Sequence, residues 1–321
     1  MPRADRAFAA LIALALASGA VLIALFLTLV PRVQHLLARG AEDAADVVAL
    51  VVLGLAFCGI ALGVGTLFRQ LGATAVLIRS LVSRKVRVPA RVRAAASGLG
   101  LEGRVDVVVD DRPFSFCYWF LRPRICLSTG LVRRLERDEL RAVLLHERYH
   151  LLHRDPLRLV VARYFAAGLY VIPVVDELVG FYTLEKEIAA DQEAVRAAGD
   201  VSALASALYK VLPDADEVSL GLLVPVSSLS VTEARIEQLV AGRRIALSLS
   251  PISVALSGGA LVAATVLVAV QGGASVFFAA LPPLVSVPTL LVGPASLLFA
   301  AAVDGGLHQF RLVTHRPVAR S

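Results

Sequence analysis

The pentapeptide His146–His150 reads His-Glu-Arg-Tyr-His, which is the pattern H-E-x-x-H. Two imidazoles four residues apart lie on the same face of a helix, where both can bind one zinc ion. The carboxylate of Glu147, beside the first imidazole, can accept a proton from water that the metal activates. These residue types in this spacing therefore predict zinc-dependent hydrolysis, if a helix carries them and a third ligand lies nearby.

Catalytic zinc takes three protein ligands and keeps a fourth position for water. A histidine six residues after the pentapeptide would complete one known pattern, but that position is Pro156. His153 could share the helix face, although three ligands on one helix would strain a tetrahedral site. Glu187 is the strongest candidate. Asp191 follows one turn later on the same face and could hold the second nitrogen of a ligand imidazole.

The sequence around these residues also predicts the helices and strands that must position them. Asp138 and Glu139 suit the start of a helix that carries the pentapeptide, and Asp155-Pro156 suits its end. A basic helix over 73–96 and a small sheet precede it. Short β-type segments are expected at residues 105–109, 114–120 and 124–128.

The second half of the site lies beyond an apolar segment, residues 157–180. A single full crossing there would put Glu187 on the opposite side of a membrane from the pentapeptide. We therefore expect a helix partly buried at the membrane surface, or a re-entrant hairpin that turns near Gly168 or Pro173. Helices are then expected at 184–198, from about 201 to 211, and at 230–239 after a capping box.

Composition places the chain among membrane proteins. Of its 321 residues 57% are hydrophobic and only 18% are charged, against about 25% charged in soluble proteins. The uncharged runs 8–30 and 47–68 each exceed the roughly 20 residues that cross a bilayer as a helix. The first run is too long for a signal peptide and reads as a retained anchor. A third run, 251–303, is long enough for two spans, with Gly272-Gly273 or Pro282-Pro283 as the turn.

The positive charges indicate the orientation. Arginines follow the second span and the last span, whereas the loop 31–46 is mildly acidic, so both termini and the middle of the chain are expected in the cytoplasm. The net charge of +6 then reflects topology and contact with lipid, and no nucleic-acid site is predicted. Cys58, Cys117 and Cys126 form no C-x-x-C pattern and are expected to be free thiols.

Several segments together resemble the BlaR/MecR-type integral-membrane zinc peptidases. They are residues 113–116, 121–125, 127–130, 139–140, the pentapeptide through Arg154-Asp155, Glu187 to Asp191, and 232–236. HtpX-type and CAAX-processing peptidases share the ligand scheme. The resemblance implies a Zn²⁺ ion held by His146, His150 and Glu187, with Glu147 as general base and then general acid. For the oxyanion the sequence offers Tyr182, whose position is more typical of an interfacial aromatic.

The expected fold is a mainly α-helical multi-pass membrane protein with a small α+β, zincin-like (gluzincin) peptidase domain. The domains are expected at 1–68 (two spans), 69–245 (peptidase), 246–303 (a hairpin of spans) and 304–321 (a basic tail). The penicillin-binding sensor of the best-known family members is not expected here, because about 18 residues follow the last span.

The expected function is hydrolysis of a protein or peptide substrate at the cytoplasmic side of the cell membrane, in regulated proteolysis, with a cytoplasmic repressor as one candidate substrate. The strand at 114–120 could offer an edge to which such a substrate pairs. Alternatives are a catalytically silent zinc-binding scaffold or signalling protein, an HtpX-like quality-control protease, and a small transporter with a fortuitous motif. The sequence predicts neither the activating signal nor the oligomeric state.

Overall fold

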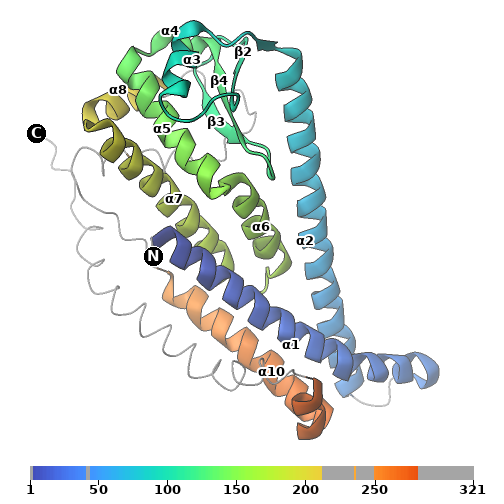
Figure 1. Ribbon diagram of the computed structural model, residues 1–321. Coiled ribbons are helices and arrows are strands. Elements are labelled where there is room, and N and C mark those ends of the chain that lie inside the picture. Colours follow the sequence, from blue (N-terminus) through green and yellow to red (C-terminus); the bar gives the residue numbers. More distant parts are fainter. Residues whose placement is uncertain (1–2, 41–43, 212–234, 236–248, 281–321) are drawn as a thin grey trace, which may run out of the picture. The chain divides into compact units, whose positions relative to one another are not determined.

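The computed structural model describes residues 3–40, 44–211, 235 and 249–280 (Figure 1). This part of the chain is mostly helical, with one small sheet. Three of its helices are long and apolar enough to cross a membrane, over Arg3–Arg39, Asp46–Ser83 and Pro251–Val268.

The chain divides into two compact units. We call the first the sheet unit (Met1–Ala4, Phe68–Val161, Tyr182–Ile245) and the second the span unit (Asp5–Leu67, Ala162–Phe181, Ala246–Ser321). The helices are α1 (Arg3–Arg39), α2 (Ala44–Ser83), α3 (Ala90–Ser97), α4 (Thr129–Arg134), α5 (Arg137–His153), α6 (Asp155–Gly168), α7 (Val174–Ala198), α8 (Val201–Val211) and α10 (Pro251–Ala280). The strands are β1 (Lys85–Val86), β2 (Val105–Val108), β3 (Ser115–Tyr118) and β4 (Arg124–Ser128).

Helix α2 is longer than the span that the sequence predicts. It has 40 residues, which at 1.5 Å per residue is about 60 Å, roughly twice the hydrocarbon core of a bilayer. The predicted separate helix over 73–96 is therefore wrong: α2 runs on to Ser83, and α3 begins only at Ala90. The strand β1 lies between them and pairs antiparallel with β2, and Pro89 disfavours helical backbone at the residue before it.

Helix α10 corrects a second expectation. It continues through Gly272 and Gly273, so the chain does not turn there. The other candidate turn, Pro282-Pro283, lies outside the described residues, as do the second half of the expected hairpin, the basic tail and most of the predicted helix at 230–239.

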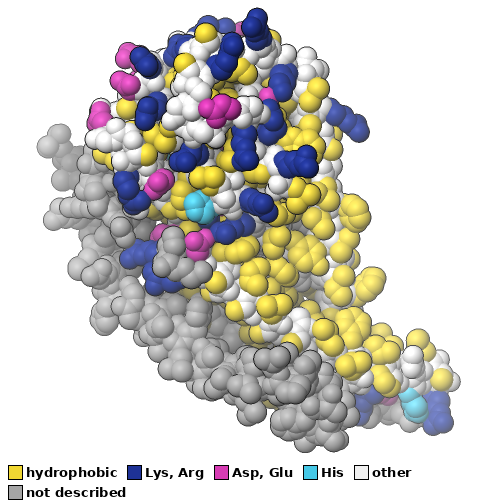
Figure 2. Space-filling view, in the orientation of Figure 1, with side chains coloured by type: hydrophobic (Ala, Val, Ile, Leu, Met, Phe, Trp, Pro, Cys, Tyr) yellow, Lys and Arg dark blue, Asp and Glu magenta, His cyan; other side chains and the backbone are white. Residues whose placement is uncertain are grey.

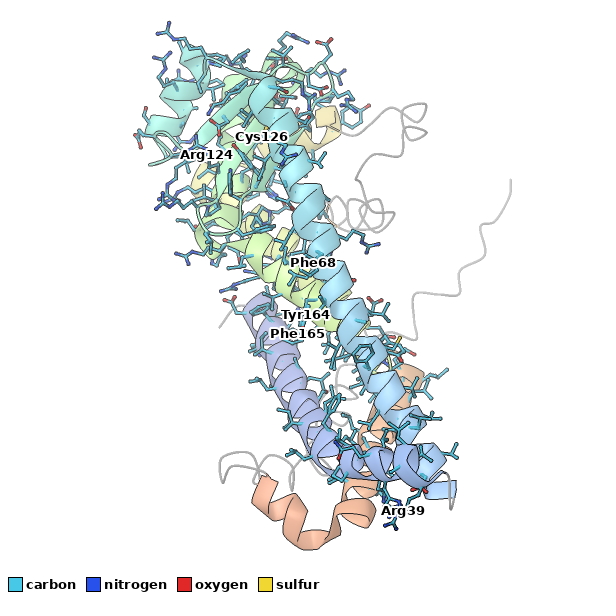
Figure 3. All side chains as sticks on the ribbon, turned by 90° about the vertical axis from the view of Figure 1, so that its right-hand side faces the viewer. Arg39, Phe68, Arg124, Cys126, Tyr164 and Phe165 are labelled. Carbon is cyan, nitrogen blue, oxygen red and sulfur yellow. The ribbon has the colours of Figure 1, made fainter. Side chains whose placement is uncertain are left out.

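The apolar segment at 157–180 folds as a helical hairpin. Helix α6 ends at Gly168 and α7 begins directly after Pro173, the two residues that the sequence named. In the span unit this turn packs closely on α2: a Cβ atom at Gly59 would collide with the carbonyl group of Gly168, and Gly63 faces Tyr164 on α6 (Figure 3). The absence of side chains lets the two backbones approach. Where the hairpin lies in a bilayer stays a prediction.

The sheet unit is built on a four-stranded sheet with the order β1-β2-β4-β3. Strands β2 and β4 are parallel, and the outer pairs are antiparallel. The central strands are buried on the face that packs against helices α3 and α5, where Val107, Ile125 and Leu127 meet Leu140 and Leu144 in one core cluster. Among the described residues β3 pairs only with β4 and forms an open edge of the sheet.

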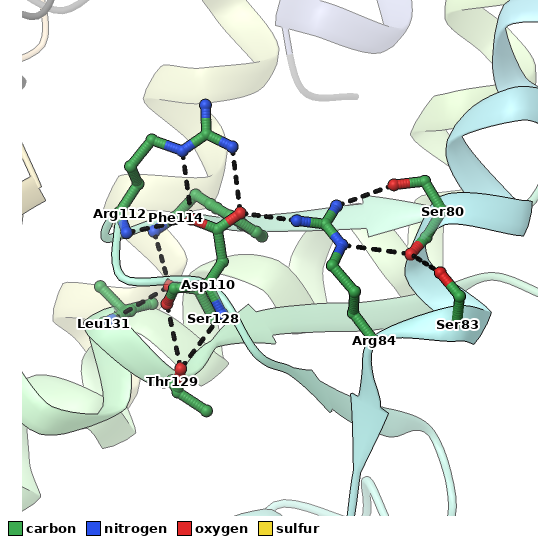
Figure 4. A network of polar contacts seen from close by, with 9 residues as sticks. All are labelled: Ser80, Ser83, Arg84, Asp110, Arg112, Phe114, Ser128, Thr129 and Leu131. Carbon is green, nitrogen blue, oxygen red and sulfur yellow. Dashed lines mark hydrogen bonds and ion pairs between the residues drawn. The ribbon is translucent and has the colours of Figure 1, made fainter.

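A polar network fixes the turn that leads into β3 (Figure 4). Asp110 accepts hydrogen bonds from the guanidinium groups of Arg84 and Arg112, and these partners lower the pKa of its carboxyl group. Thr129 exchanges two hydrogen bonds with the backbone of Asp110. Ser128 accepts from the N–H groups of Phe114 and Leu131, so it also caps α4. The start of β3 is thereby tied to the end of β4.

Candidate active site

Helix α5 carries the pentapeptide and is held at both ends. At its start Glu136 and Glu139 form a reciprocal capping box, and Glu139 also accepts hydrogen bonds from Ser206 and Lys210 on α8. The lysine ammonium is one reason why the pKa of the Glu139 carboxyl group stays below its ordinary value although burial raises it. The helix is thus positioned by tertiary contacts as well as by its own cap.

At its other end α5 stops two residues earlier than predicted. Its last residue is His153, and Arg154 takes a left-handed backbone conformation with φ 52°. Asp155 and Pro156 then open α6 and do not close α5. A proline is tolerated in the first turn of a helix, where its missing N–H has no partner in any case. The sharp turn leaves the Asp155 side chain facing back onto the pentapeptide.

His146, His150 and Glu187 come together as a group whose ligand atoms lie within 4.8 Å of one another. The two Nε2 atoms are 3.1 Å apart, and each lies 3.5 Å from an oxygen of Glu187. Ligand atoms at tetrahedral corners about 2.0–2.1 Å from a zinc ion would be separated by about 3.3 Å. The donor set and its spacing therefore fit a zinc ion.

The side of the site around His146 depends on two distant segments. Nδ1 of His146 lies 2.8 Å from Oδ1 of Asp191, one helical turn after Glu187 on α7. Arg235 donates to both oxygens of Asp191 and lies 3.0 Å from an oxygen of Glu187. The guanidinium group is buried among these carboxylates, and they raise its pKa. Asp191 therefore lies at the second nitrogen of His146.

The side around His150 is supported by a residue that the sequence analysis did not assign a role. Nδ1 of His150 lies 2.9 Å from Oδ2 of Asp155, and the other oxygen of Asp155 is 3.1 Å from the ammonium group of Lys186. The sequence predicts Asp155 only as part of a helix stop. Its spacing of five residues from His150 matches no helical face, and only the left-handed turn at Arg154 brings it round.

Glu147 is buried at 5% exposure and receives a hydrogen bond of 2.8 Å from the hydroxyl group of Ser115 on β3. This contact joins the proposed general base to the open edge strand. Ser115 is not predictable in this role from the sequence, because a serine in a short strand has no distinguishing pattern.

The ionisation of the cluster follows from its opposite charges. Burial lowers the pKa of His146, but Asp191 and Glu187 more than offset it and raise that pKa to about 10. Burial raises the pKa of the Glu187 and Asp191 carboxyl groups, whereas the histidines and Arg235 hold both well below their ordinary range. The two carboxylates therefore stay ionised, and without a metal His146 carries a proton at neutral pH.

Other candidates lie elsewhere. His153 stacks on Tyr149 and contacts its backbone carbonyl oxygen at 2.8 Å, and it is not part of the ligand group. Tyr182 is buried at 2% exposure, so a substrate carbonyl group could not reach it in this arrangement. All three cysteines are free thiols, as expected, and burial raises the pKa of Cys126 to about 12.

Comparisons with known proteins agree with this geometry. Part of the chain is 34% identical to "Protease HtpX homolog 1" of Streptomyces coelicolor, a match that covers 28% of this chain and 40% of that relative. Residues 12–239 match the family described as BlaR1 peptidase M56. This match includes the pentapeptide, Glu187, Asp191 and Arg235, and it extends over more than half of the sequence. The chain belongs to the BlaR1 peptidase M56 family.

Proposed function

We propose that the protein is a membrane-embedded zinc endopeptidase that hydrolyses peptide bonds of a protein substrate at the cytoplasmic side of the membrane. The observation that carries the proposal is the convergence of His146, His150 and Glu187 at zinc-ligand spacing, directly beside the carboxylate of Glu147. A structural zinc site has no use for such a carboxylate next to its ligands. Family membership supports the same reaction class.

In this mechanism His146, His150 and Glu187 would hold the metal, which supplies Lewis acidity to a carbonyl group and to water. Glu147 accepts the proton of the attacking water and later delivers it to the leaving amine. The hydroxyl group of Ser115 orients Glu147 by its 2.8 Å hydrogen bond. Asp191 and Asp155 fix the rotation of the two imidazoles, so that each presents Nε2 to the ligand position.

The open edge of the sheet supports the proposal that the substrate binds as an extended chain. β3 contributes Ser115 to the site and pairs only with β4 among the described residues. An extended peptide can add to such an edge through main-chain hydrogen bonds. We propose that the substrate is laid along β3 in this way, next to Glu147.

The finer features remain our proposals. They are a multi-pass topology with both termini in the cytoplasm, a peptidase domain at 69–245 between spans, and a role in regulated proteolysis with a cytoplasmic repressor as one candidate substrate. The three apolar helices support membrane insertion. An HtpX-like role in quality control is favoured by the partial match to the Streptomyces coelicolor protease.

The variant Glu147→Gln tests the proposal. It keeps the shape of the side chain and leaves all three ligands intact, so zinc should stay bound at one ion per chain. Peptide cleavage should fall about 100- to 10,000-fold, the usual contribution of general acid–base catalysis. Zinc is measured by metal analysis of the purified protein, and cleavage by mass spectrometry of an unfolded protein substrate. Unchanged turnover would exclude Glu147 as the base, and absence of cleavage in the wild type would favour the silent scaffold.

A further inference from the structure

A groove of about 1120 Å³ lies on the sheet unit where the β3–β4 turn meets the last turn of α5. The proposed mechanism does not use this groove. Its exposed lining combines cationic and large apolar side chains. They are Arg104, Arg122, Arg154, Trp119, Leu121 and Leu152.

Three arginines of the groove have no counter-charge within the part of the chain that the structure describes. None of the guanidinium groups of Arg104, Arg122 and Arg154 lies within ion-pair distance of a described carboxylate, and no Asp or Glu is among the groove-lining residues. Arg124 in the same groove differs, because it makes a bidentate pair with Asp106. The three exposed arginines therefore present positive charge that an external anion can neutralise.

The apolar side chains of the groove project outward. Trp119 is 44% exposed, Leu121 74% and Leu152 59%. The backbone of Trp119 is left-handed, with φ 69°, and Trp119 and Arg154 are the non-glycine residues with positive φ in the described chain. This conformation is unfavourable for a bulky residue and persists where the surrounding structure imposes it, often at a functional surface. Both residues line this groove.

The chain leaves the sheet unit after Val161, a few residues beyond the groove-lining Arg154. Helix α6 begins directly after Arg154 and continues into the apolar hairpin. Helix α2 passes into the unit at Phe68, partway along its length (Figure 3). Arginine and hydrophobic side chains are interspersed over the face of this unit shown in Figure 2. A bilayer surface offers both anions and apolar contact.

We propose that this groove is a docking surface for anionic phospholipids of the membrane. The arginines bind lipid phosphates, each as a bidentate partner. Trp119 lies at the level of the headgroups, the depth that tryptophan prefers, and Leu121 and Leu152 contact the first acyl carbons. An acidic peptide could neutralise the arginines but gives no reason for exposed leucines beside them. The proposal holds whether or not the chain hydrolyses peptides.

Trp119 can serve as the fluorescence probe for this proposal, because it is the single tryptophan of the chain. The full-length Glu147→Gln variant is reconstituted into vesicles of phosphatidylcholine alone or with phosphatidylglycerol. With the anionic lipid, Trp119 emission should shift to shorter wavelength and should be quenched by lipids brominated near the headgroup. Equal emission in both bilayers without quenching would overturn the proposal. So would quenching that appears only when an acidic peptide is added.

A charge-matched pair of variants separates the groove from general electrostatics. Arg104→Gln/Arg122→Gln removes two groove charges, whereas Arg134→Gln/Arg137→Gln removes two exposed charges near the start of α5. Each arginine near an anionic bilayer contributes roughly 5-fold to the binding constant. The groove variant should therefore lower the equilibrium constant for docking of the β3–β4 hairpin on anionic lipid roughly 30-fold. The control pair should leave the quenching unchanged. An equal loss in both variants would contradict a specific docking surface.

Discussion

The two histidines of the ligand group are supported in different ways. Around His150 the carboxylate is close in sequence, because Asp155 follows five residues later, and its cation Lys186 lies on α7. Around His146 it comes from far away, because Asp191 lies on α7 and Arg235 follows some forty residues after that. Each imidazole thus faces a carboxylate that faces a cation. The carboxylate next to His150 comes from a local turn, whereas the carboxylate next to His146 and the cations of both pairs come from distant segments.

The difference shows which contacts hold the site together. The pair of His150 and Asp155 can form as soon as α5 meets α6. The group of His146, Asp191 and Arg235 exists only when α7 and the segment at residue 235 have docked on α5. We therefore expect losses on either side to weaken metal binding, and losses on the His146 side to affect folding more strongly.

Glu187 joins both sides and should give the largest effect. Glu187→Ala removes one of three ligands and leaves Arg235 with one carboxylate fewer, so stoichiometric zinc and cleavage should both be lost. Metal analysis of the purified variant checks this. Glu193→Ala is the control, because Glu193 is a partly exposed residue of the same helix that pairs with Arg196. Full zinc occupancy in Glu187→Ala would mean that another residue supplies the third ligand.

The two supporting aspartates allow a direct comparison. Asp191→Asn and Asp155→Asn should each weaken zinc binding by about 10- to 100-fold, measured by competition with a chelator. Both variants should lower the melting temperature, because each leaves a buried cation, Arg235 or Lys186, less compensated. The fall should be larger for Asp191→Asn, because Asp191 accepts two hydrogen bonds from Arg235 and so joins a distant segment to the site. If Asp155→Asn is the more destabilising of the two, the proposed asymmetry between the sides is wrong.

The cations that pair with these two aspartates, Arg235 and Lys186, should show the same order of effects, with smaller losses of zinc affinity. Arg235→Met removes contacts to two carboxylates, whereas Lys186→Met removes the ion pair to Asp155 and the cation–π contacts with Tyr149 and Tyr182. The arginine variant should therefore bind zinc more weakly than the lysine variant. Combining Arg235→Met with Asp191→Asn should add little to either change alone, because the two side chains act as a unit. Strict additivity in this double-mutant cycle would show that they act separately.

The pH dependence of the metal-free protein should be the smallest effect. The pKa of His146 is raised from 6.5 to about 10, so its contribution to stability is full below pH 6.5 and is lost as pH rises toward 10. After zinc is removed by chelation, the melting temperature should fall across this window. With zinc bound the fall should be absent, because the ligand is the neutral imidazole. Asp191→Asn should flatten the metal-free profile, and Asp155→Asn should not.

The helices and strands that depend on local sequence are predictable, whereas only some of the contacts between distant segments are. The segment 124–128 is β4, and the break at Gly199 separates α7 from α8, because turn residues and β-branched runs act locally. Glu187 and Asp191 lie beside the histidines, since a four-residue spacing puts both on one helix face, and their roles stay predictions.

What the sequence could not show depends on backbone geometry and on tertiary pairing. Asp155 reaches His150 only because Arg154 has a left-handed backbone conformation, and an arginine at that position does not indicate such a conformation. The continuation of α2 to Ser83 is likewise invisible, because Arg69 and Arg79 look like the end of a span although they do not interrupt a helix. Ser115 acquires its contact with Glu147 only when the sheet packs on α5.

The open edge of β3 also bears on association between copies of the chain. An unpaired strand edge will accept the edge of another molecule as readily as a substrate, and proteins limit this risk with short strands, prolines and charges. β3 has only four residues, Pro113 precedes it, and Arg112 and Arg122 lie on either side. Four residues can hold a flexible peptide long enough for chemistry but are too few to seed a lasting sheet between two molecules. The short length of β3 therefore limits pairing between copies of the chain and still leaves the strand edge accessible to a peptide.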